Sequence, residues 1–386
     1  MPDTIYDIAI IGSGPAGYTA AIRAGQYGLK TALIEKDNVL GGTCLHVGCI
    51  PTKALLFNAE LWDHLKDAKE FGIEGVETPK LNWAAVQERK SKIVAKHAKG
   101  LEFLMKKNKV ETIRGHGKLT GPAQNSVLTV EVTSEGKTTL VKAKNAILCT
   151  GSEARMLPGL DPGDQVLTNI EILALKEIPE SLVIVGAGAV GVEFASIFRS
   201  FGAEVTLIEM LPRLVPIEDE EISKELARVY RKRGIAFHTG AKVEKIEKSK
   251  SGITVNFSVD GKPQKIETEK ILIAVGRKPR TENIGLERTK IKPDRGFIKT
   301  DSWMQTAEPG VYAIGDIVLG TPQLAHVGSM EGIVAVTKIA GKKGKPINPE
   351  HIPNATYCHP EIGSVGLTEA KAQEACLLYT SPSPRD

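Results

Sequence analysis

One pattern occurs twice in this sequence and limits the folds that the chain can adopt. Residues 8–17, Ile-Ala-Ile-Ile-Gly-Ser-Gly-Pro-Ala-Gly, have the same form as residues 182–191, Leu-Val-Ile-Val-Gly-Ala-Gly-Ala-Val-Gly. Each copy predicts a short buried strand that runs into a glycine turn and then a helix. The copies align without a gap at one constant offset, which pairs Gly12, Gly14, Gly17, Gly28 and Glu35 with Gly186, Gly188, Gly191, Gly202 and Glu209. Two similar strand–helix–strand units are therefore predicted.

The glycines and glutamates of these units match the chemistry of dinucleotide binding. The first glycine permits a tight turn, the second lets the backbone approach a pyrophosphate, and the third allows close packing of helix and strand. The helix N-terminus offers partial positive charge to the phosphates. Glu35 and Glu209 end the predicted strands 31–35 and 205–209, where a carboxylate can accept both hydroxyls of an adenosine ribose. A lone glycine motif could be a turn in another α/β protein, but two complete units in register favour dinucleotide binding.

The acidic residue of the second unit bears on the choice between NAD and NADP. Glu209 would repel the 2′-phosphate of NADP, because both groups are negatively charged. NAD is therefore favoured for this unit. Arg213, a few positions further on, keeps NADP open as the alternative, because a guanidinium can bind a phosphate.

The length and charge of the chain restrict its domain count and its partners. A chain of 386 residues is long enough for about two to four domains. Its 50 basic and 46 acidic residues nearly balance and are spread along the chain, which disfavours nucleic acid or an anionic membrane as the main partner. No apolar run approaches the roughly 18 residues of a membrane span, and no basic leader precedes an apolar stretch. We expect a cytoplasmic protein without membrane spans.

The remaining segments predict how the two units are connected. Residues 81–108 predict an amphipathic helix with a lysine-rich face in solvent, and residues 126–144 predict a strand meander. Residues 146–151 and 271–276 both predict buried strands that end in glycine, where the chain would cross between domains. Residues 310–316 predict a strand that ends in Gly-Asp and returns the chain to the first domain. The predicted fold is α/β, with two Rossmann-like dinucleotide-binding domains, the first interrupted by the second.

Two cysteines just after the first unit predict redox chemistry. Cys44 and Cys49 lie five positions apart, which in an ideal α-helix separates their Cα atoms by roughly 8.6 Å. A disulfide needs about 7 Å or less. The pair can therefore be bridged only if the helix start is irregular, as Gly41, Gly42 and Gly48 would permit.

The residues alone leave other interpretations of this pair open. Isolated cysteines are often small buried hydrophobic residues. Two thiols without a nearby second Cys or His pair do not complete a tetrahedral zinc site, so no metal site is expected. With a nucleotide unit just upstream, a redox pair is favoured. Cys149, Cys358 and Cys376 have no such partner and are interpreted as structural or incidental.

The segment that holds the two cysteines carries a family resemblance. Residues 41–53, Gly-Gly-Thr-Cys-Leu-His-Val-Gly-Cys-Ile-Pro-Thr-Lys, are similar to the active-disulfide motif of the pyridine nucleotide-disulfide oxidoreductases. With both glycine units in place, the resemblance covers most of the chain. Within this family, the chain most resembles the enzymes that oxidise dihydrolipoyl groups. The resemblance implies FAD in the first unit, NAD in the second and a redox disulfide against the flavin ring.

The resemblance also implies roles for individual residues. Cys44 would exchange with substrate, Cys49 would lie next to the flavin, and Lys53 would lie near flavin N5 with Glu193 as its acidic partner. The alternative for Lys53 and Glu193 is an ordinary ion pair on a helix surface. The implied FAD-binding residues are Gly12, Gly14, Gly17, Glu35, Lys53, Gly117, Thr150, Gly151, Asp316, Ala325 and His326, and the implied NAD-binding residues are Gly186, Gly188, Gly191, Glu209 and Gly276.

The same resemblance implies domains, an activity and partners. The domains are an FAD-binding domain at 1–150, an NAD-binding domain at 151–275, a second FAD-binding or central part at 276–347 and a fragment of an α+β dimerisation domain at 348–376. The activity is oxidation of protein-bound dihydrolipoyl groups with reduction of NAD, and the partners are the lipoyl domains of 2-oxoacid dehydrogenase complexes. A related disulfide or mercuric reductase is the alternative, which Leu45, Ile50 and Glu209 disfavour.

The end of the chain departs from the family pattern. Residues 357–367 and 368–375 resemble the first strand and helix of the dimerisation domain, after which the family continues to a His-x-x-x-x-Glu motif that supplies a base to the partner subunit. No such motif follows Cys376, and residues 377–386 are a polar stretch interrupted by proline. We expect a non-native tail, and loss of the homodimer and of full turnover. A flavin-binding fragment without lipoyl turnover is the alternative from a different class.

Overall fold

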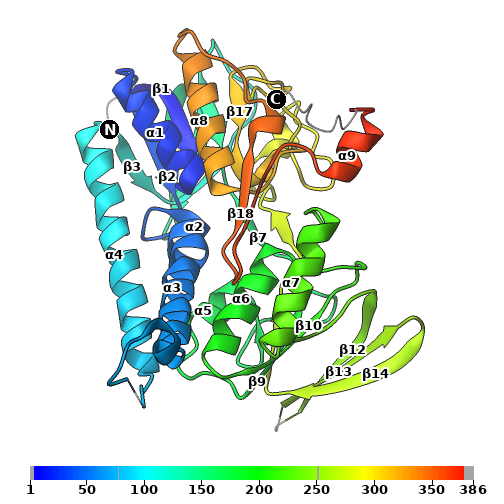
Figure 1. Ribbon diagram of the computed structural model, residues 1–386. Coiled ribbons are helices and arrows are strands. Elements are labelled where there is room, and N and C mark those ends of the chain that lie inside the picture. The colour runs from blue at the N-terminus through cyan, green and yellow to red at the C-terminus, as the bar shows by residue number, and fades with distance from the viewer. Residues whose placement is uncertain (1–3, 77, 250–251, 378–386) are drawn as a thin grey trace, which may run out of the picture. The chain divides into compact units, whose positions relative to one another are not determined.

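The computed structural model describes residues 4–76, 78–249 and 252–377. These residues form two compact units (Figure 1). The first unit draws on the ranges Met1–Pro51, Glu88–Ala154 and Arg277–Ile347, and the second draws on Thr52–Gln87, Arg155–Gly276 and Asn348–Asp386. Two helices, α3 (Cys49–Lys66) and α4 (Trp83–Lys107), contribute residues to both units.

The first unit is built on a mixed sheet of seven described strands. They are β1 (Ile5–Ile11), β2 (Thr31–Glu35), β3 (Glu111–Arg114), β4 (His116–Leu119), β5 (Leu128–Ser134), β6 (Lys137–Leu148) and β17 (Val311–Ala313). Their order is β3-β2-β1-β6-β5-β4, with β17 beside the end of β6. Strands β1, β2, β3, β17 and the last part of β6 are parallel, whereas β4, β5 and the first part of β6 form an antiparallel meander.

Helices α1 (Pro15–Gln26) and α8 (Ala325–Ile339) lie side by side on the parallel part of this sheet (Figure 1). Helix α1 begins directly after the glycine turn, with Gly14 as its N-cap and Pro15 at its first position, where the missing N–H leaves no bond unmade. The two helices approach closely because Gly328 and Gly332 of α8 face Ala16 and Ala20 of α1. Shorter elements of this unit are α2 (Gly42–Val47), η2 (Leu286–Arg288) and η3 (Gly315–Ile317).

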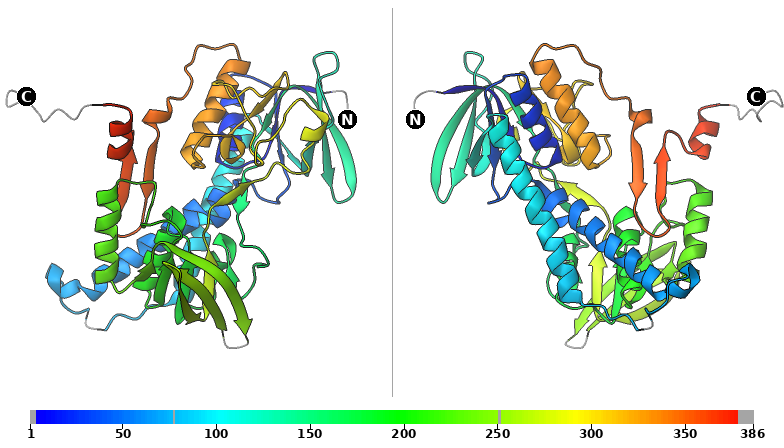
Figure 2. Two further views of the ribbon diagram at one scale, coloured as in Figure 1. Left: turned by 90° about the vertical axis from the view of Figure 1, so that its right-hand side faces the viewer. Right: turned by 60° about the vertical axis from the view of Figure 1, so that its left-hand side comes forward.

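The second unit repeats the parallel arrangement. Its described strands are β8 (Val166–Leu167), β9 (Ser181–Val185), β10 (Glu204–Ile208), β11 (Ala236–His238) and β15 (Lys270–Ile273). They are all parallel, in the order β11-β10-β9-β15-β8. Helix α6 (Ala189–Ser200) follows β9 through a glycine turn, as α1 follows β1. The strands β12 (Ala241–Ser249), β13 (Gly252–Val259) and β14 (Lys262–Thr268) form a separate antiparallel sheet (Figure 2).

The second unit also holds helix α7 (Glu220–Lys232), whose first turn is acidic and last turn basic, as the helix dipole favours. A hairpin of β18 (Pro353–Thr356) and β19 (Ile362–Val365) docks near the start of α7, where Asn354 donates to Glu218 Oε1 at 2.8 Å. The remaining elements are α5 (Asn169–Leu173), α9 (Glu369–Glu374), η1 (Ala68–Phe71) and η4 (Pro349–His351), together with the strands β7 (Ser152–Ala154) and β16 (Arg277–Pro279), which pair in the first unit.

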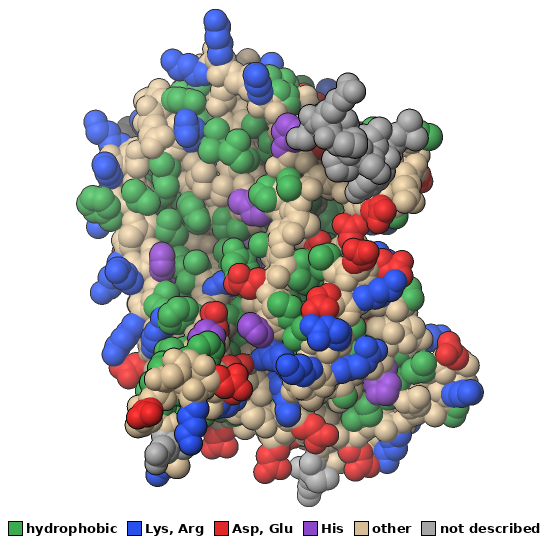
Figure 3. Space-filling view, in the orientation of Figure 1, with side chains coloured by type: hydrophobic (Ala, Val, Ile, Leu, Met, Phe, Trp, Pro, Cys, Tyr) green, Lys and Arg blue, Asp and Glu red, His purple; other side chains and the backbone are tan. Residues whose placement is uncertain are grey.

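The α/β fold with two parallel strand–turn–helix units is confirmed, and so is the helix predicted at 81–108, which is α4. Its lysines line an exposed face at the edge of the molecule seen in Figure 3. Two strand predictions differ in detail. The meander predicted at 126–144 forms as β5 and the first part of β6, and β6 continues without a break into the strand predicted at 146–151; its first part pairs with β5 and its last part with β1. Of the strand predicted over 357–367, only β19 forms. The predicted non-native tail, apart from Leu377, lies outside the described residues.

The compact units divide the chain differently from the predicted domains. Residues 52–87, assigned from the sequence to the first domain, pack in the second unit, because Leu55, Ala59 and Trp83 enter its hydrophobic core. The described residues after 347 also join the second unit. The division into functional FAD, NAD and dimerisation domains stays a prediction.

The core of the second unit predicts the effect of removing one aromatic ring. Phe198 is fully buried, with its ring centroid 6.3 Å from that of Trp83 and 6.4 Å from that of Phe194. Phe198→Ala should lower the free energy of unfolding by about 3–5 kcal/mol, because it leaves a cavity among close-packed rings. Tryptophan fluorescence during urea unfolding, to which Trp83 of this core contributes, would measure this loss. Phe103→Ala, at a 64% exposed position, is the matched control and should change stability by less than about 0.5 kcal/mol; equal effects would contradict this description of the core.

Candidate functional site

The two glycine turns have the same geometry in both units. Gly12 and Gly186 have φ angles of 109° and 104°, which strongly favour glycine. A Cβ atom at either position would overlap a backbone carbonyl oxygen, that of Cys149 or that of Ala274. The third glycines are equally constrained, since a Cβ on Gly17 would overlap the carbonyl oxygen of Gly12, and one on Gly191 that of Gly186. These four glycines are therefore required for close backbone packing.

The second glycine of each turn differs from the other two. A Cβ atom added to Gly14 or Gly188 would meet no described atom within 4 Å, and both residues have ordinary extended backbone angles. Protein packing therefore does not require glycine at either position. Each is the N-cap of a 12-residue helix, so the free space lies at the positive end of a helix dipole. An open approach to backbone N–H groups at this end suits a phosphate group.

Glu35 and Glu209, which lie at the end of the second strand of each unit, accept hydrogen bonds from the glycine turns in the same way. Glu35 Oε2 accepts from the Ser13 N–H at 2.9 Å, and its Oε1 accepts from the Asp37 N–H at 2.9 Å. Glu209 Oε2 accepts from the Ala187 N–H at 2.6 Å, and its Oε1 accepts from the Leu211 N–H at 2.8 Å. Both side chains are buried, at 6% and 8% exposure. Each carboxylate is thus fixed beside its own glycine turn, with lone pairs left for a further donor.

The first unit adds two hydrogen bonds of the Ser13 hydroxyl that the second unit lacks. Ser13 Oγ donates to Glu35 Oε2 at 2.6 Å and accepts from the Gly41 N–H at 3.1 Å, which ties the turn to the start of the cysteine segment. In the second unit the equivalent residue, Ala187, has no hydroxyl. The alignment of the two copies pairs Ser13 with Ala187, so the sequence shows this difference. The hydrogen bond from Gly41 to the Ser13 hydroxyl, however, appears only in the structure.

Arg213, which left NADP as the alternative cofactor of the second unit, hydrogen-bonds within its own loop. Its Nη2 donates to the carbonyl oxygens of Pro216 and Glu218 at 3.1 and 3.0 Å. A guanidinium engaged in this way would have to break two hydrogen bonds to reach a 2′-phosphate. Its geometry therefore adds to the preference for NAD that Glu209 predicts.

Cys44 and Cys49 form a disulfide in the first unit, with their Cα atoms 4.7 Å apart. The predicted irregularity lies at Gly48, which ends α2 and separates it from α3 with φ and ψ of −147° and −118°. A Cβ atom at Gly48 would lie 2.9 Å from the Thr43 carbonyl oxygen and 3.2 Å from the Cys44 Cα. The absence of a side chain at this residue therefore lets the two cysteines approach within the range that a disulfide needs.

The two sulfurs differ in their electrostatic surroundings. Cys49 is the first residue of α3, an 18-residue helix, whereas Cys44 lies inside the six-residue α2. The partial positive charge at a helix N-terminus stabilises a thiolate. After reduction, Cys49 is therefore the sulfur better able to carry a negative charge.

The other cysteines do not share this environment. Cys149 is buried and its thiol donates to the carbonyl oxygens of Ile11 and Gly12, both at 3.1 Å, and burial raises its pKa strongly. Burial likewise raises the pKa of Cys358 to about 12. Both thiols stay protonated at neutral pH, which agrees with their interpretation as structural residues. Cys376 is exposed.

Lys53 and Glu193 form a bidentate ion pair in the second unit. Lys53 Nζ lies 2.8 Å from each oxygen of Glu193. The Glu193 side chain is only 6% exposed and that of Lys53 is 36% exposed. The alternative of an ordinary surface pair therefore does not describe this contact. Lys53 lies one turn after Cys49 along α3, since residues four apart share a helix face.

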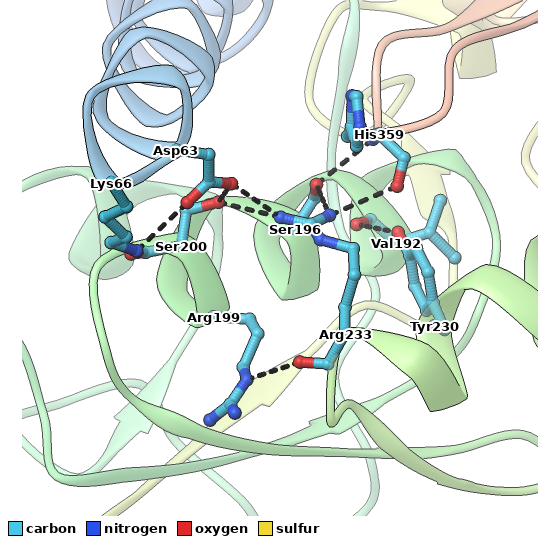
Figure 4. A network of polar contacts seen from close by, with 9 residues as sticks. All are labelled: Asp63, Lys66, Val192, Ser196, Arg199, Ser200, Tyr230, Arg233 and His359. Atoms are coloured by element: carbon cyan, nitrogen blue, oxygen red, sulfur yellow. Dashed lines mark hydrogen bonds and ion pairs between the residues drawn. The ribbon is translucent and has the colours of Figure 1, made fainter. Parts of the chain in front are cut away.

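Glu193 begins a line of buried polar residues on α6 that continues with Ser196 and Ser200. All three are less than 6% exposed. Figure 4 shows how Arg233 satisfies the two serines, donating to Ser196 Oγ at 2.7 Å and to Ser200 Oγ at 2.8 Å. It also pairs with Asp63 of α3 at 3.1 Å. A largely buried guanidinium thus links α3 to α6 at Asp63, ten residues after Lys53 along α3.

Asp316 belongs to a second polar cluster, in the first unit. Its Oδ2 accepts a short hydrogen bond from Ser152 Oγ, which in turn accepts from Arg277 Nε at 2.6 Å. Arg277 Nη2 also donates to the Ser152 carbonyl oxygen at 2.9 Å. Burial lowers the pKa of Arg277, and the nearby Asp316 opposes this shift. Ser152 and Arg277 were missed from the sequence, although each directly follows one of the glycines that end the two parallel passages.

The other predicted residues lie close to these elements. Thr150 Oγ1 and the Gly151 carbonyl oxygen bond to the backbone of Arg280, and Gly276 accepts from the Arg155 N–H in the second unit. Three further residues were predicted to bind FAD. Gly117 lies in β4, where an added Cβ atom would contact Ile11 and Ile34, and Ala325 and His326 begin α8.

Glu331 is a further buried residue that the sequence did not indicate. Its Oε2 accepts from the Gly315 N–H at 2.5 Å, next to Asp316. Burial raises the pKa of Glu331 to about 7. Only the three-dimensional packing of α8 on the turn before Asp316 brings it there.

The described residues hold neither a membrane-spanning helix nor a cluster of metal ligands. None of the described helices combines the length and apolar character needed to cross a membrane. Among the same residues, no three His, Cys, Asp or Glu side chains are gathered as metal ligands would be.

Comparison with known proteins places this geometry in a family. The model of the family described as "Pyridine nucleotide-disulphide oxidoreductase" matches residues 6–332. A dihydrolipoyl dehydrogenase of Bacillus subtilis is 45% identical over 377 residues, which cover 96% of this chain and 79% of the relative. The crystal structure of LpdA from Mycobacterium tuberculosis has a TM-score of 0.88 at 26% identity, covering 95% of this chain and 80% of that one.

A second solved structure is the HOCl-induced flavoprotein disulfide reductase RclA from Escherichia coli, in a Cu(II) complex. It has a TM-score of 0.83 at 27% identity and covers 96% of this chain and 79% of that one. The family match spans most of the chain, and curated relatives at 40–45% identity include dihydrolipoyl dehydrogenases of several bacteria. The chain belongs to the pyridine nucleotide-disulphide oxidoreductase family, as the paired glycine turns and the bridged cysteines predict.

Proposed function

We propose that this protein is a dihydrolipoyl dehydrogenase, which oxidises dihydrolipoyl groups and reduces NAD through the Cys44–Cys49 disulfide and FAD. The observation that carries the proposal is this disulfide, formed at the start of a long helix in the same unit as a glycine turn closed by Glu35. The identity of 45% to a dihydrolipoyl dehydrogenase over 96% of the chain supports the same activity. Related disulfide or mercuric reductases, the alternative from the sequence, are not favoured by these relatives.

The first unit fits FAD. The space over Gly14 and the N-terminus of α1 would admit its pyrophosphate, and the lone pairs left on Glu35 would accept adenosine ribose hydroxyls. Asp316, held in place by Ser152 and Arg277, would accept a hydroxyl of the ribityl chain. The other residues proposed to hold FAD are Gly12, Gly17, Lys53, Gly117, Thr150, Gly151, Ala325 and His326. When bound, FAD would accept two electrons from a dithiol and pass them to NAD.

The second unit fits NAD by the same physical argument. The space over Gly188 at the N-terminus of α6 would admit a pyrophosphate, and Glu209 would accept ribose hydroxyls. The other residues proposed to hold NAD are Gly186, Gly191 and Gly276. Because Glu209 repels a 2′-phosphate and Arg213 is bonded to its own loop, NAD is proposed rather than NADP.

The cysteines would take the electrons from substrate by thiol–disulfide exchange. A dihydrolipoyl thiolate attacks Cys44, forms a mixed disulfide and releases Cys49 as a thiolate. The second dihydrolipoyl thiol then loses its proton to solvent, and its thiolate attacks the substrate sulfur of the mixed disulfide and releases Cys44 as a thiolate, which leaves an oxidised lipoyl group and a reduced cysteine pair. Attack at Cys44 is favoured because a better-stabilised thiolate leaves faster, and Cys49 lies at the N-terminus of α3.

Lys53 would support this chemistry from the next turn of α3. Its ammonium adds positive charge to the same end of the helix that carries Cys49. The bidentate contact with Glu193 fixes the direction of the side chain, so that the charge stays in one place instead of being distributed over several rotamers.

The partners of this activity are also proposed. Lipoyl domains of 2-oxoacid dehydrogenase complexes would deliver the dihydrolipoyl group, because the relatives in this family carry that activity in their names. The homodimer of the intact family and a cytoplasmic location stay predictions from the sequence.

The redox role of the cysteines can be tested by single replacements. Cys44→Ser and Cys49→Ser should each lower the rate of dihydrolipoamide oxidation by at least about 1000-fold, because neither variant can form the disulfide. Dihydrolipoamide-dependent NADH formation would measure the rate. Cys376→Ser, at an exposed free thiol, is the matched control and should keep the parent rate. A Cys44→Ser variant with normal turnover would exclude the proposed function.

The nucleotide preference can be tested at Glu209. The parent protein should prefer NADH to NADPH by about 2–4 kcal/mol, because Glu209 accepts ribose hydroxyls and repels a 2′-phosphate. Glu209→Ala should narrow that difference, whereas Glu204→Ala, an exposed position on the same strand β10, should not. Binding of both nucleotides can be followed by isothermal titration calorimetry. If the parent binds both equally, the role given to Glu209 is wrong.

A further inference from the structure

Tyr357 contacts both members of the Lys53–Glu193 pair. Lys53 Nζ lies 4.8 Å from the centroid of the Tyr357 ring, within the range of a cation–π contact. The backbone N–H of Tyr357 donates to Glu193 Oε1 at 2.9 Å. The same carboxylate oxygen therefore accepts from Lys53 and from the Tyr357 backbone.

These contacts limit how the ammonium can move. Two directions of the Lys53 ammonium are fixed by the two Glu193 oxygens, and the aromatic ring lies over the charge. The carboxylate is fixed in turn, because one oxygen also binds a backbone N–H that cannot rotate away. Lys53 remains 36% exposed, so the pair keeps one open side.

The backbone at Tyr357 is held independently of its side chain. His359 bonds to α6 and to the residue that follows α7: its N–H donates to Ser196 Oγ at 3.1 Å, and its carbonyl oxygen accepts from Arg233 at 3.1 Å, as Figure 4 shows. Cys358 is fully buried. The Tyr357 side chain itself is 44% exposed, and within the described part of the chain its hydroxyl makes no hydrogen bond. The ring can therefore be changed while the backbone contact with Glu193 is kept.

We propose that Tyr357 is a positioning residue of the active site, which orients the Lys53 ammonium through its ring and the Glu193 carboxylate through its backbone N–H. The value of this orientation for turnover rests on the function proposed above. The contact of Tyr357 with Lys53 and Glu193 does not depend on that function, because it is formed by residues of this chain alone. The sequence assigned this segment only to a dimerisation fragment, so Tyr357 gives it a second role within the same chain.

The test compares Tyr357→Leu with Tyr357→Phe in the full chain. Phenylalanine keeps the aromatic face and loses only the unbonded hydroxyl, whereas leucine loses the face and keeps the backbone N–H. With ¹³C-lysine labelling, the ε-methylene signal of Lys53 is identified by its loss in Lys53→Arg. Ring current should shift this signal upfield in the parent and in Tyr357→Phe, and the shift should disappear in Tyr357→Leu.

Kinetics with dihydrolipoamide and NAD provide the second readout. Tyr357→Leu should lower kcat about 3- to 10-fold, the size of a partly exposed cation–π contact, with KM unchanged and Tyr357→Phe at the parent rate. Equal Lys53 signals in all three proteins, or an unaltered kcat in Tyr357→Leu, would overturn the proposal. A parent protein without any dihydrolipoamide activity would instead refute the proposed function, and the Lys53 signal would then decide this inference alone.

Discussion

The break in the helix at Gly48 is the constraint on which the redox chemistry depends. A continuous helix would hold the Cα atoms of Cys44 and Cys49 roughly 8.6 Å apart, too far for a disulfide. Because Gly48 has no side chain, the backbone can turn there, and the Cα atoms approach to 4.7 Å. The same break starts α3 at Cys49, so that one cysteine gains a helix N-terminus and the other does not. One glycine thus both permits the bridge and makes its two sulfurs unequal.

The two strand–turn–helix units share one hydrogen-bond arrangement. In each, a buried carboxylate at the end of the second strand accepts a backbone N–H from the glycine turn, at Ser13 or Ala187. This bond fixes the carboxylate at the place where a ribose would bind, and it joins the end of the second strand to the glycine turn 22 residues earlier. The disulfide lies only in the first unit, where Ser13 also binds the backbone of Gly41 just before the cysteines. On the proposed function the shared turn would bind the nucleotide in each unit, and the extra hydroxyl connects the first copy to the redox segment.

The parts of the site that repeat or depend on short spacing could be predicted from the sequence. The aligned glycines located both turns, and the spacing of Cys44 and Cys49 required an irregular helix start among Gly41, Gly42 and Gly48, of which the structure selects Gly48 as the break. Contacts between distant segments could not be predicted. The burial of Glu193, the ring of Tyr357 over Lys53 and the Ser152–Arg277 support of Asp316 depend on how separate elements pack, and no local pattern records this packing.

The most direct test of the account is the redox midpoint of the cysteine pair in Gly48→Ala. The added Cβ would press on Thr43 and Cys44 at 2.9 and 3.2 Å, at a cost of about 1–3 kcal/mol borne mainly by the bridged form. The midpoint should therefore become about 20–60 mV more positive than in the parent. It can be measured by equilibration with set ratios of dihydrolipoamide and lipoamide, acid quenching, alkylation and mass spectrometry. Gly100→Ala, where a Cβ meets open space, should leave the midpoint unchanged. A midpoint in Gly48→Ala equal to that of the parent would contradict the claim that the bridge depends on this glycine.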